Sequence, residues 1–257
     1  MKILMIDVGG TNVKLMASGH EGRRKVPSGP KLTAEDMIKE VLNATKDWEY
    51  EAVSLGYPGH VVDGRPTTEP GNLGNGWVAF DYESAFKRPV RIINDAAMQA
   101  LASYREGRML FLGFGTSIGA TEIVDDVIVP LEIGRLRLKC GACFMEQLTA
   151  KALVADGKRK WVKAVTEAVE IMRDLTRPND IVLGGGNAKR IDPLPPGCRR
   201  KDNQVAFVGA KRMWEGADLI ATSYGSSWRI SRTGKQKTQE PGAAADGSAD
   251  SSDRESP

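Results

Sequence analysis

The sequence has few of the residues that mark a secreted or membrane-embedded protein. Only three of its 257 residues are cysteine and two are histidine, and aromatic side chains make up 6%. An odd number of cysteines fits a reducing compartment better than a disulfide scaffold. No apolar run approaches the roughly 20 residues that span a bilayer, and the N-terminus carries no signal pattern. We therefore expect a cytoplasmic protein that contacts no membrane.

A strong charge of either sign is missing as well. The chain has 36 basic and 33 acidic residues, a formal net charge of +3, so electrostatics do not favour nucleic acid as a partner. What it does have is 41% hydrophobic residues, enough to fill the core of one large domain or of two lobes of about a hundred residues each.

The segment after Ile230 differs from the rest of the chain. Residues 231–257 contain no aromatic residue and no Leu, Ile or Val, and they are rich in Ser, Gly, Ala and charged residues. Such a composition cannot offset the entropy that ordering costs. We expect a disordered tail here.

Strands and helices alternate through the first half of the chain. Two strand-like runs, 2–6 and 12–18, are close enough to form an antiparallel hairpin around a glycine turn. A helix is expected over 33–46, with Thr33 in a capping-box position. Further on, a strand is expected in 52–59 and a strand that turns into a helix in 88–104.

The second half begins with the same arrangement of strand, glycine turn and strand as the first. Residues 108–130 again form strand, glycine turn and strand, and helices are then expected over 145–155 and 159–175, a strand over 180–186 and a last helix within 205–221. Two halves that open alike indicate an internally duplicated α/β fold with a cleft between two lobes. We place the lobes at 1–105 and 106–230.

The first glycine turn has the composition of an anion site. Gly9 and Gly10 let backbone N–H groups approach an anion closely, and Thr11 adds a hydroxyl donor. A carboxylate beside a phosphate would repel it unless a divalent cation intervenes, so Asp7 is a candidate Mg²⁺ ligand. The alternative is a tight hairpin whose Asp and Gly serve only the turn geometry.

A second glycine turn, with Gly115 and Thr116, follows about a hundred residues later. Two such turns could face each other across a cleft and grip a polyphosphate chain from both sides. A third glycine run, Gly184, Gly185 and Gly186, follows an apolar strand and could let a base and ribose lie against backbone. Taken alone, that run would be a packing or turn feature.

Polar side chains stand where ligands bind in α/β sheets. Asp95 lies at a strand end that enters a helix, and its carboxylate could accept a proton from a hydroxyl that attacks phosphorus. Its alternative role is the N-cap of that helix. Asn94 could orient a hydroxyl, and Asn72, in the loop 70–77, suits the polar edges of a sugar.

The motifs, taken in order, resemble the ROK family of sugar kinases and repressors, and in particular its short glucokinases and polyphosphate glucokinases. The resemblance covers residues 1 to about 220. It implies an actin-like ATPase domain fold, in which two ribonuclease-H-like lobes hold the sugar deep in a cleft with the phosphate donor above it. The motifs that carry it are DVGGTNVK, GYPG, INDAAMQAL, LGFGTSIG, PLEIG, MEQLTAKAL and VLGGGN.

The resemblance also implies roles for single residues. Asp95 is similar to the catalytic base of the family, with Asn94 beside it on the sugar, and Glu132 and Glu146 match glutamates that bind the sugar. The metal and donor side, with Asp7 as the metal ligand, is implied for Asp7, Gly9, Gly10, Thr11, Lys14, Gly115, Thr116, Gly184, Gly185 and Gly186.

The chain departs from the family around one motif. Arg135 stands where the family carries a histidine that binds a structural zinc and touches the sugar. Only Cys140 and Cys143 remain of the cysteine cluster, which is half of a tetrahedral site, so we expect no structural zinc. Arg135 itself could bind a sugar hydroxyl, pair with Glu132 or favour an anionic acceptor.

These observations together predict a hexose kinase. It would transfer a phosphoryl group from ATP or inorganic polyphosphate to the 6-hydroxyl of glucose or a related sugar, with Mg²⁺, and the family suggests a homodimer. Basic runs at 158–160 and 199–201 could guide polyphosphate or could simply be solvated. The alternatives are a weakly catalytic sugar-binding regulator and a kinase for another small alcohol, such as the type III pantothenate kinases.

Overall fold

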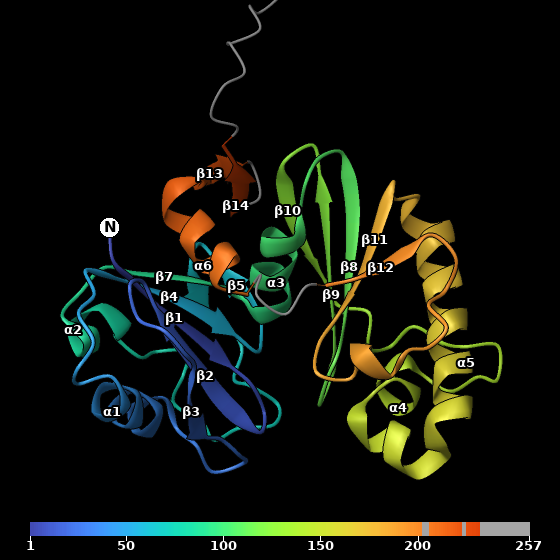
Figure 1. Cartoon of the computed structure of the whole chain (residues 1–257), viewed down its shortest axis with the longest axis horizontal. Helices are drawn as coiled ribbons and strands as arrows, with labels where there is room; N and C mark the ends of the chain where they lie inside the picture. The colour runs from blue at the N-terminus through green and yellow to red at the C-terminus, as the bar shows by residue number, and fades with distance from the viewer. Residues whose placement is uncertain (202–205, 223–224, 232–257) are drawn as a thin grey trace, which may run out of the picture.

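The computed structural model describes residues 1–201, 206–222 and 225–231, and it contains two large mixed sheets that stand side by side (Figure 1). In the first sheet β1 is antiparallel to β2 and parallel to β4, which in turn is parallel to β7. The expected N-terminal hairpin is thereby confirmed. The strand order is β3 (Arg24–Pro27), β2 (Asn12–Ala17), β1 (Ile3–Val8), β4 (Ala52–Tyr57) and β7 (Val90–Asn94).

The second sheet is built around the second expected strand pair. In it β8 is antiparallel to β9 and parallel to β11. A small separate hairpin consists of β5 (Val61–Val62) and β6 (Arg65–Pro66). The order of the second sheet is β12 (Cys198–Arg200), β11 (Asp180–Gly184), β8 (Arg108–Phe114), β9 (Ile118–Val124), β10 (Val127–Leu131), β14 (Gly225–Ile230) and β13 (Ala217–Thr222).

Helices lie outside the first sheet, between the two sheets and beside the second sheet (Figure 1). The first two helices pack on the outer face of the first sheet, α3 and α6 lie between the sheets, and α4 and α5 flank the second sheet. None of the helices in the described ranges is both long and apolar enough to cross a membrane. The helices are α1 (Ala34–Ala44), α2 (Tyr82–Phe86), α3 (Asp95–Ser103), α4 (Phe144–Gln147), α5 (Ala150–Thr176) and α6 (Ala206–Glu215), with a 3₁₀ turn at Ala188–Arg190.

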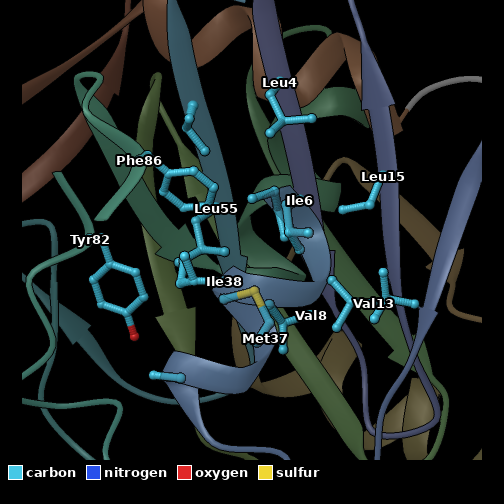
Figure 2. Close-up of a cluster of buried hydrophobic side chains, with 14 of the residues drawn as sticks. Leu4, Ile6, Val8, Val13, Leu15, Met37, Ile38, Leu55, Tyr82 and Phe86 are labelled. Atoms are coloured by element: carbon cyan, nitrogen blue, oxygen red, sulfur yellow. The ribbon is translucent and has the colours of Figure 1, made fainter. Parts of the chain in front are cut away.

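The alternation of side chains along β1 explains this layering. Leu4, Ile6 and Val8 point to the outer face and pack with α1, as Figure 2 shows, whereas Met5 joins the cluster around α3 between the sheets. Successive side chains of a strand point to opposite faces. The same rule puts Asp7 on the inner face, where the two sheets approach each other.

The C-terminal region differs from the expectation. The last helix ends at Glu215, and Ala217–Thr222 forms strand β13 instead of continuing the helix. Gly216 interrupts the helix, and antiparallel pairing with β14 then captures the segment. Pairing within this hairpin, which β14 joins to β10 of the second sheet, outweighs local helical propensity.

Helix α5 also differs. The expected helix 145–155 is divided between α4 and the start of α5, and α5 then continues through the expected helix 159–175 with a break at Gly157, which has φ 78°. On its second part Trp161, Val165, Val169 and Met172, which share one helical face, are buried. The proposed boundary between residues 105 and 106 stays a prediction, as does the tail, since residues 232–257 lie outside the described part.

Candidate functional site

A cavity of about 1100 Å³ opens between the two sheets. Its walls come from both sheets: the β1–β2 turn, the β7–α3 junction, the β8–β9 turn and the segment after β11. A volume of this size exceeds that of a typical small-molecule pocket. It can hold a sugar together with a phosphate donor.

Asp7 faces this cavity because of its place on β1. In the antiparallel pairing it lies directly opposite Lys14 on β2, and Lys14 Nζ donates to Asp7 Oδ2 at 2.9 Å. Asp7 is only 5% exposed, whereas the Lys14 side chain is half-exposed. A cation and a carboxylate therefore stand together at the base of the first glycine turn.

The two glycine turns lie against each other. A Cβ atom on Gly10 would stand 2.2 Å from Asn72 Nδ2 and 3.3 Å from Thr116 Cγ2. No side chain fits at Gly10 unless Asn72 moves. The first turn, the 70–77 loop and the second turn thus meet at one point on the cavity wall.

The second turn is held by segments that come later in the chain. Gly115 N–H donates to Ser117 O at 3.0 Å, and Gly115 O accepts from Ala150 N, the first residue of α5, at 2.8 Å. Asn187 N–H donates to Phe114 O at 3.0 Å. These bonds fix the loop that would face an anionic ligand.

The third glycine run divides between two roles. Gly185 has φ 80°, and a Cβ there would lie 2.5 Å from Phe114 O. Gly185 and Gly186 line the cavity, but Gly184 is not among its lining residues. A Cβ on Gly184 would stand 2.4 Å from Phe111 Cζ, so this glycine makes room for a core ring.

At the β7–α3 junction the capping residue is Asn94. Its Oδ1 accepts from Ala96 N at 3.0 Å and Ala97 N at 3.1 Å, and its Nδ2 donates to Gly59 O at 3.1 Å. Both ends of the amide are engaged in holding the helix start. Asp95 is the first helical residue, and its Oδ1 accepts from Ala96 N at 2.8 Å.

The environment of Asp95 favours its protonated form. Burial, with the Asp7 carboxylate as the second cause, raises the pKa of Asp95 to about 7. The Ala96 amide and Lys14 act in the opposite direction but are weaker. A carboxylate with such a pKa can both accept and release a proton near neutrality.

The sugar-side residues are placed differently from one another. Asn72, Glu132 and Arg135 line the cavity. His60 Nε2 lies 3.1 Å from Glu132 Oε1, so the partner of this carboxylate is an imidazole; no ion pair between Glu132 and Arg135 occurs within the described ranges.

Glu146 does not join the other predicted site residues. It is exposed and absent from the cavity wall, and its carboxylate accepts from Cys143 N at 2.7 Å. That bond lowers the pKa of Glu146 and caps the short helix α4.

Four residues in or next to the cavity wall are not among the site residues predicted from the sequence. His60, Glu69 and Gln99 line the cavity; Lys201 stands behind Gln99 and donates to its Oε1 at 3.2 Å. Burial lowers the pKa of Lys201 to about 8. Gln99 lies one helical turn after Asp95 and could have been found by that spacing, whereas the others depend on tertiary contacts.

The comparisons with known proteins agree on one group. No family model matches the chain. A polyphosphate glucokinase of Mycobacterium leprae is 28% identical over 227 residues, which is 78% of this chain and 68% of that protein. One from Mycobacterium tuberculosis is 26% identical over 217 residues, covering 74% and 80% respectively.

Two solved structures have the same fold. The inorganic polyphosphate/ATP-glucomannokinase from Arthrobacter sp. strain KM has a TM-score of 0.70 at 25% identity, over 81% of this chain and 96% of that one. A ROK family glucokinase from Streptomyces griseus, in complex with glucose and AMPPNP, has a TM-score of 0.68 at 18% identity, over 82% and 98%. The chain is similar to polyphosphate glucokinases and has the fold of the ROK sugar kinases. The expected actin-like ATPase fold is confirmed.

The chain differs from the family that it resembles around Arg135 and the cysteines. Cys140, Cys143 and Cys198 are free, and no group of three or more His, Cys, Asp or Glu side chains that could hold a metal occurs in the part of the chain that the structure describes. The expectation that no structural zinc binds stays a prediction.

The basic run 199–201 does not form a track along the cleft. Arg199 Nη2 contacts Asp180 Oδ2 at 2.6 Å. Arg200 donates to the carbonyl oxygens of Ala188 and Ile191 at 3.2 and 2.7 Å. Both arginines fix the β11–β12 edge, and only Lys201 reaches toward the cavity.

Proposed function

We propose that the chain is a hexose kinase that transfers the terminal phosphoryl group of ATP or inorganic polyphosphate to the 6-hydroxyl of glucose or a related sugar. The observation that carries this proposal is the Asp95 carboxylate. It lines the cavity whose wall also includes both glycine turns, and its pKa is raised to about 7. Its relatives are named for this chemistry.

In the proposed reaction Asp95 takes the proton of the sugar hydroxyl while its oxygen attacks the terminal phosphorus. The proton moves to the carboxylate, and the bond between the phosphorus and the donor's bridging oxygen breaks. The N–H groups of Gly9 and Gly115 donate within their own turns, so the backbone N–H groups of Gly10 and Thr116, with the Lys14 ammonium, stabilise the negative charge on the transferring group. The two walls exclude water, which limits hydrolysis of the donor.

The residues present fit a magnesium ion that arrives with the donor. Mg²⁺ is held in kinases by one or two carboxylates together with phosphate oxygens and water, and Asp7 supplies a carboxylate at the base of the first turn. When bound, the ion neutralises charge on the phosphates. Asp7 would hold it directly or through water, and Lys14 keeps the carboxylate oriented.

The donor side supports both phosphate sources. The two turns would bind a phosphate chain, which ATP and polyphosphate share. Gly185 and Gly186 would offer an open backbone surface for an adenosine group. The Arthrobacter relative is named for both donors. We expect a cytoplasmic homodimer, and the comparisons do not favour a regulator or a kinase of another alcohol.

The direct test measures phosphoryl transfer from ATP and from polyphosphate to a panel of sugars. Asp95→Asn keeps the size of the side chain and an acceptor for Ala96 N, and loss of the general base should lower kcat about 10²- to 10⁴-fold. Asp174→Asn is the matched control because this exposed carboxylate on α5 lies off the cavity wall. An unaltered rate in Asp95→Asn, or no transfer to any sugar, contradicts the proposal.

A further inference from the structure

The loop that follows β4 holds His60 in a fixed position at the edge of the cavity. His60 N–H donates to Thr68 Oγ1 at 3.2 Å, and its carbonyl oxygen accepts from Thr67 N at 3.0 Å. Tyr57 OH donates to Thr68 O at 2.7 Å. The backbone on either side of the imidazole is therefore tied down before the side chain makes any contact.

The hairpin that starts at His60 is also fastened to the second sheet. Asp63 Oδ1 accepts from Ser226 N at 2.7 Å, and Asp63 has a positive φ of 51° at the tip of the β5–β6 hairpin. Ser226 belongs to β14. The loop that carries His60 thus bridges the first and second sheets at a point other than the imidazole.

The imidazole itself crosses from one wall of the cavity to the other. His60 follows β4 of the first sheet, whereas Glu132 follows β10 of the second, and His60 Nε2 stands 3.1 Å from Glu132 Oε1. Both side chains line the cavity and are more than half exposed. An exposed pair of this kind contributes little to stability, so its groups are available to a ligand.

We propose that His60 is a sugar-recognition residue, which binds one hydroxyl of the hexose while Glu132 binds its neighbour. This inference rests on the proposed kinase function and assigns to it a residue outside the predicted set. A sugar offers adjacent hydroxyls that each donate and accept, and an imidazole beside a carboxylate offers a donor and an acceptor side by side. Inverting one of those hydroxyls leaves a polar group unpaired, which is how such sites discriminate.

The chain offers a matched control, because it contains only two histidines. His20 stacks on Trp48 with ring centroids 5.3 Å apart, and it does not line the cavity. His20→Gln and His60→Gln therefore remove the same chemical group from two places. A general effect of losing an imidazole would appear in both variants.

The kinetic test compares these two full-length variants with the wild-type protein. His60→Gln should raise the KM for the sugar about 10- to 100-fold, in line with the loss of a hydrogen bond to a charged or strongly polar group, and leave the KM for the donor unchanged. The preference between hexoses that differ at one hydroxyl should weaken. An unaltered KM and preference in His60→Gln, or an equal loss in His20→Gln, overturns the proposal.

A binding measurement keeps this inference separate from the kinase proposal. In His20→Gln a single imidazole resonance remains, and adding glucose without a donor should shift it. A shift in a protein that transfers no phosphoryl group would sustain the recognition role while refuting the kinase activity. Glucose that binds, by calorimetry, without moving the His60 resonance refutes the recognition role.

Discussion

Asn94 and Asp95 divide two tasks that one residue at a helix start often performs alone. Asn94 Oδ1 accepts the amides of Ala96 and Ala97, so the cap of α3 is complete without the next residue. The carboxylate of Asp95 is left to face the cavity. The structure assigns the cap to Asn94, and the role of Asp95 as the base stays a prediction.

The rate of phosphoryl transfer should depend on the charge of Asp95. Only the ionised form accepts a proton, and its pKa is about 7. We expect kcat/KM to rise with pH up to about 7 and then to level off. A profile that is flat between pH 5 and 8 would show that this carboxylate is not the base.

Two charge substitutions should move that inflection in opposite directions. The Asp7 carboxylate raises the pKa of Asp95 and the Lys14 ammonium lowers it. Asp7→Asn should therefore shift the titration of Asp95 toward acid, and Lys14→Met toward alkali. Carboxyl resonances recorded without divalent cation measure both shifts, and a shift of the same sign in the two variants would contradict the arrangement.

The raised pKa also predicts how stability changes with pH. Below about pH 4 Asp95 is protonated in both folded and unfolded states. Between about 4 and 7 only the unfolded state loses the proton, so the group costs stability as pH rises, up to about 4 kcal/mol above pH 7. That figure is an upper bound because the carboxylate is partly exposed to the cavity.

Asp95→Asn has no such titration. The free energy of unfolding of this variant should therefore increase relative to that of the wild type as pH rises from 4 to 7. Urea unfolding at several pH values measures the difference. A difference that stays constant across that range would show that the carboxylate is not desolvated.

Gly10→Ala should disturb the site more than the fold. The new methyl group would stand 2.2 Å from Asn72 Nδ2, and this side chain end can move aside, so we expect less than about 1 kcal/mol of destabilisation but roughly a tenfold fall in kcat/KM. In an Asn72→Ala background, adding Gly10→Ala should lower kcat/KM little further, because the obstructing amide is gone. Gly29→Ala, where the Cβ meets nothing within 4 Å, should leave the rate unaltered.

Gly209→Ala should act on stability through the crossing of α6 with α3. A Cβ there would lie 2.2 Å from Met98 O, a backbone atom that cannot turn away, and overpacking of this kind costs about 1–3 kcal/mol. Thermal unfolding checks it against Gly216→Ala, whose Cβ would lie 3.8 Å from Arg212 O. Equal melting temperatures in the two variants would refute the close crossing.

Much of the local structure follows from the sequence, because its signals act over a few residues. The Thr33 side chain caps α1 by accepting from Asp36 N, as the capping pattern indicates. The spacing of Met37, Ile38, Val41 and Leu42 also predicts one buried stripe on that helix, but Leu42 is 37% exposed. Its position at the margin of the stripe explains the error.

The site was less accessible to sequence reasoning where two distant segments create it. Gly184 resembles a ligand-contacting glycine until Phe111, a residue of another strand, is seen to fill the space beside it. His60 has no local pattern that marks it, since its partner Glu132 belongs to the other sheet. Such pairings depend on the fold and leave no periodic trace along the chain.

The packing of α6 has a consequence for how the protein forms during synthesis. Ser54, on the inner face of the first sheet, is fully buried, and its Oγ donates to Ala210 O at 2.8 Å and accepts from Trp214 Nε1 at 2.9 Å. The strands of that sheet are all made by Asn94, yet both partners of Ser54 lie far downstream on α6. During synthesis, this part of the inner face of the first sheet therefore stays exposed to solvent until α6 has been made.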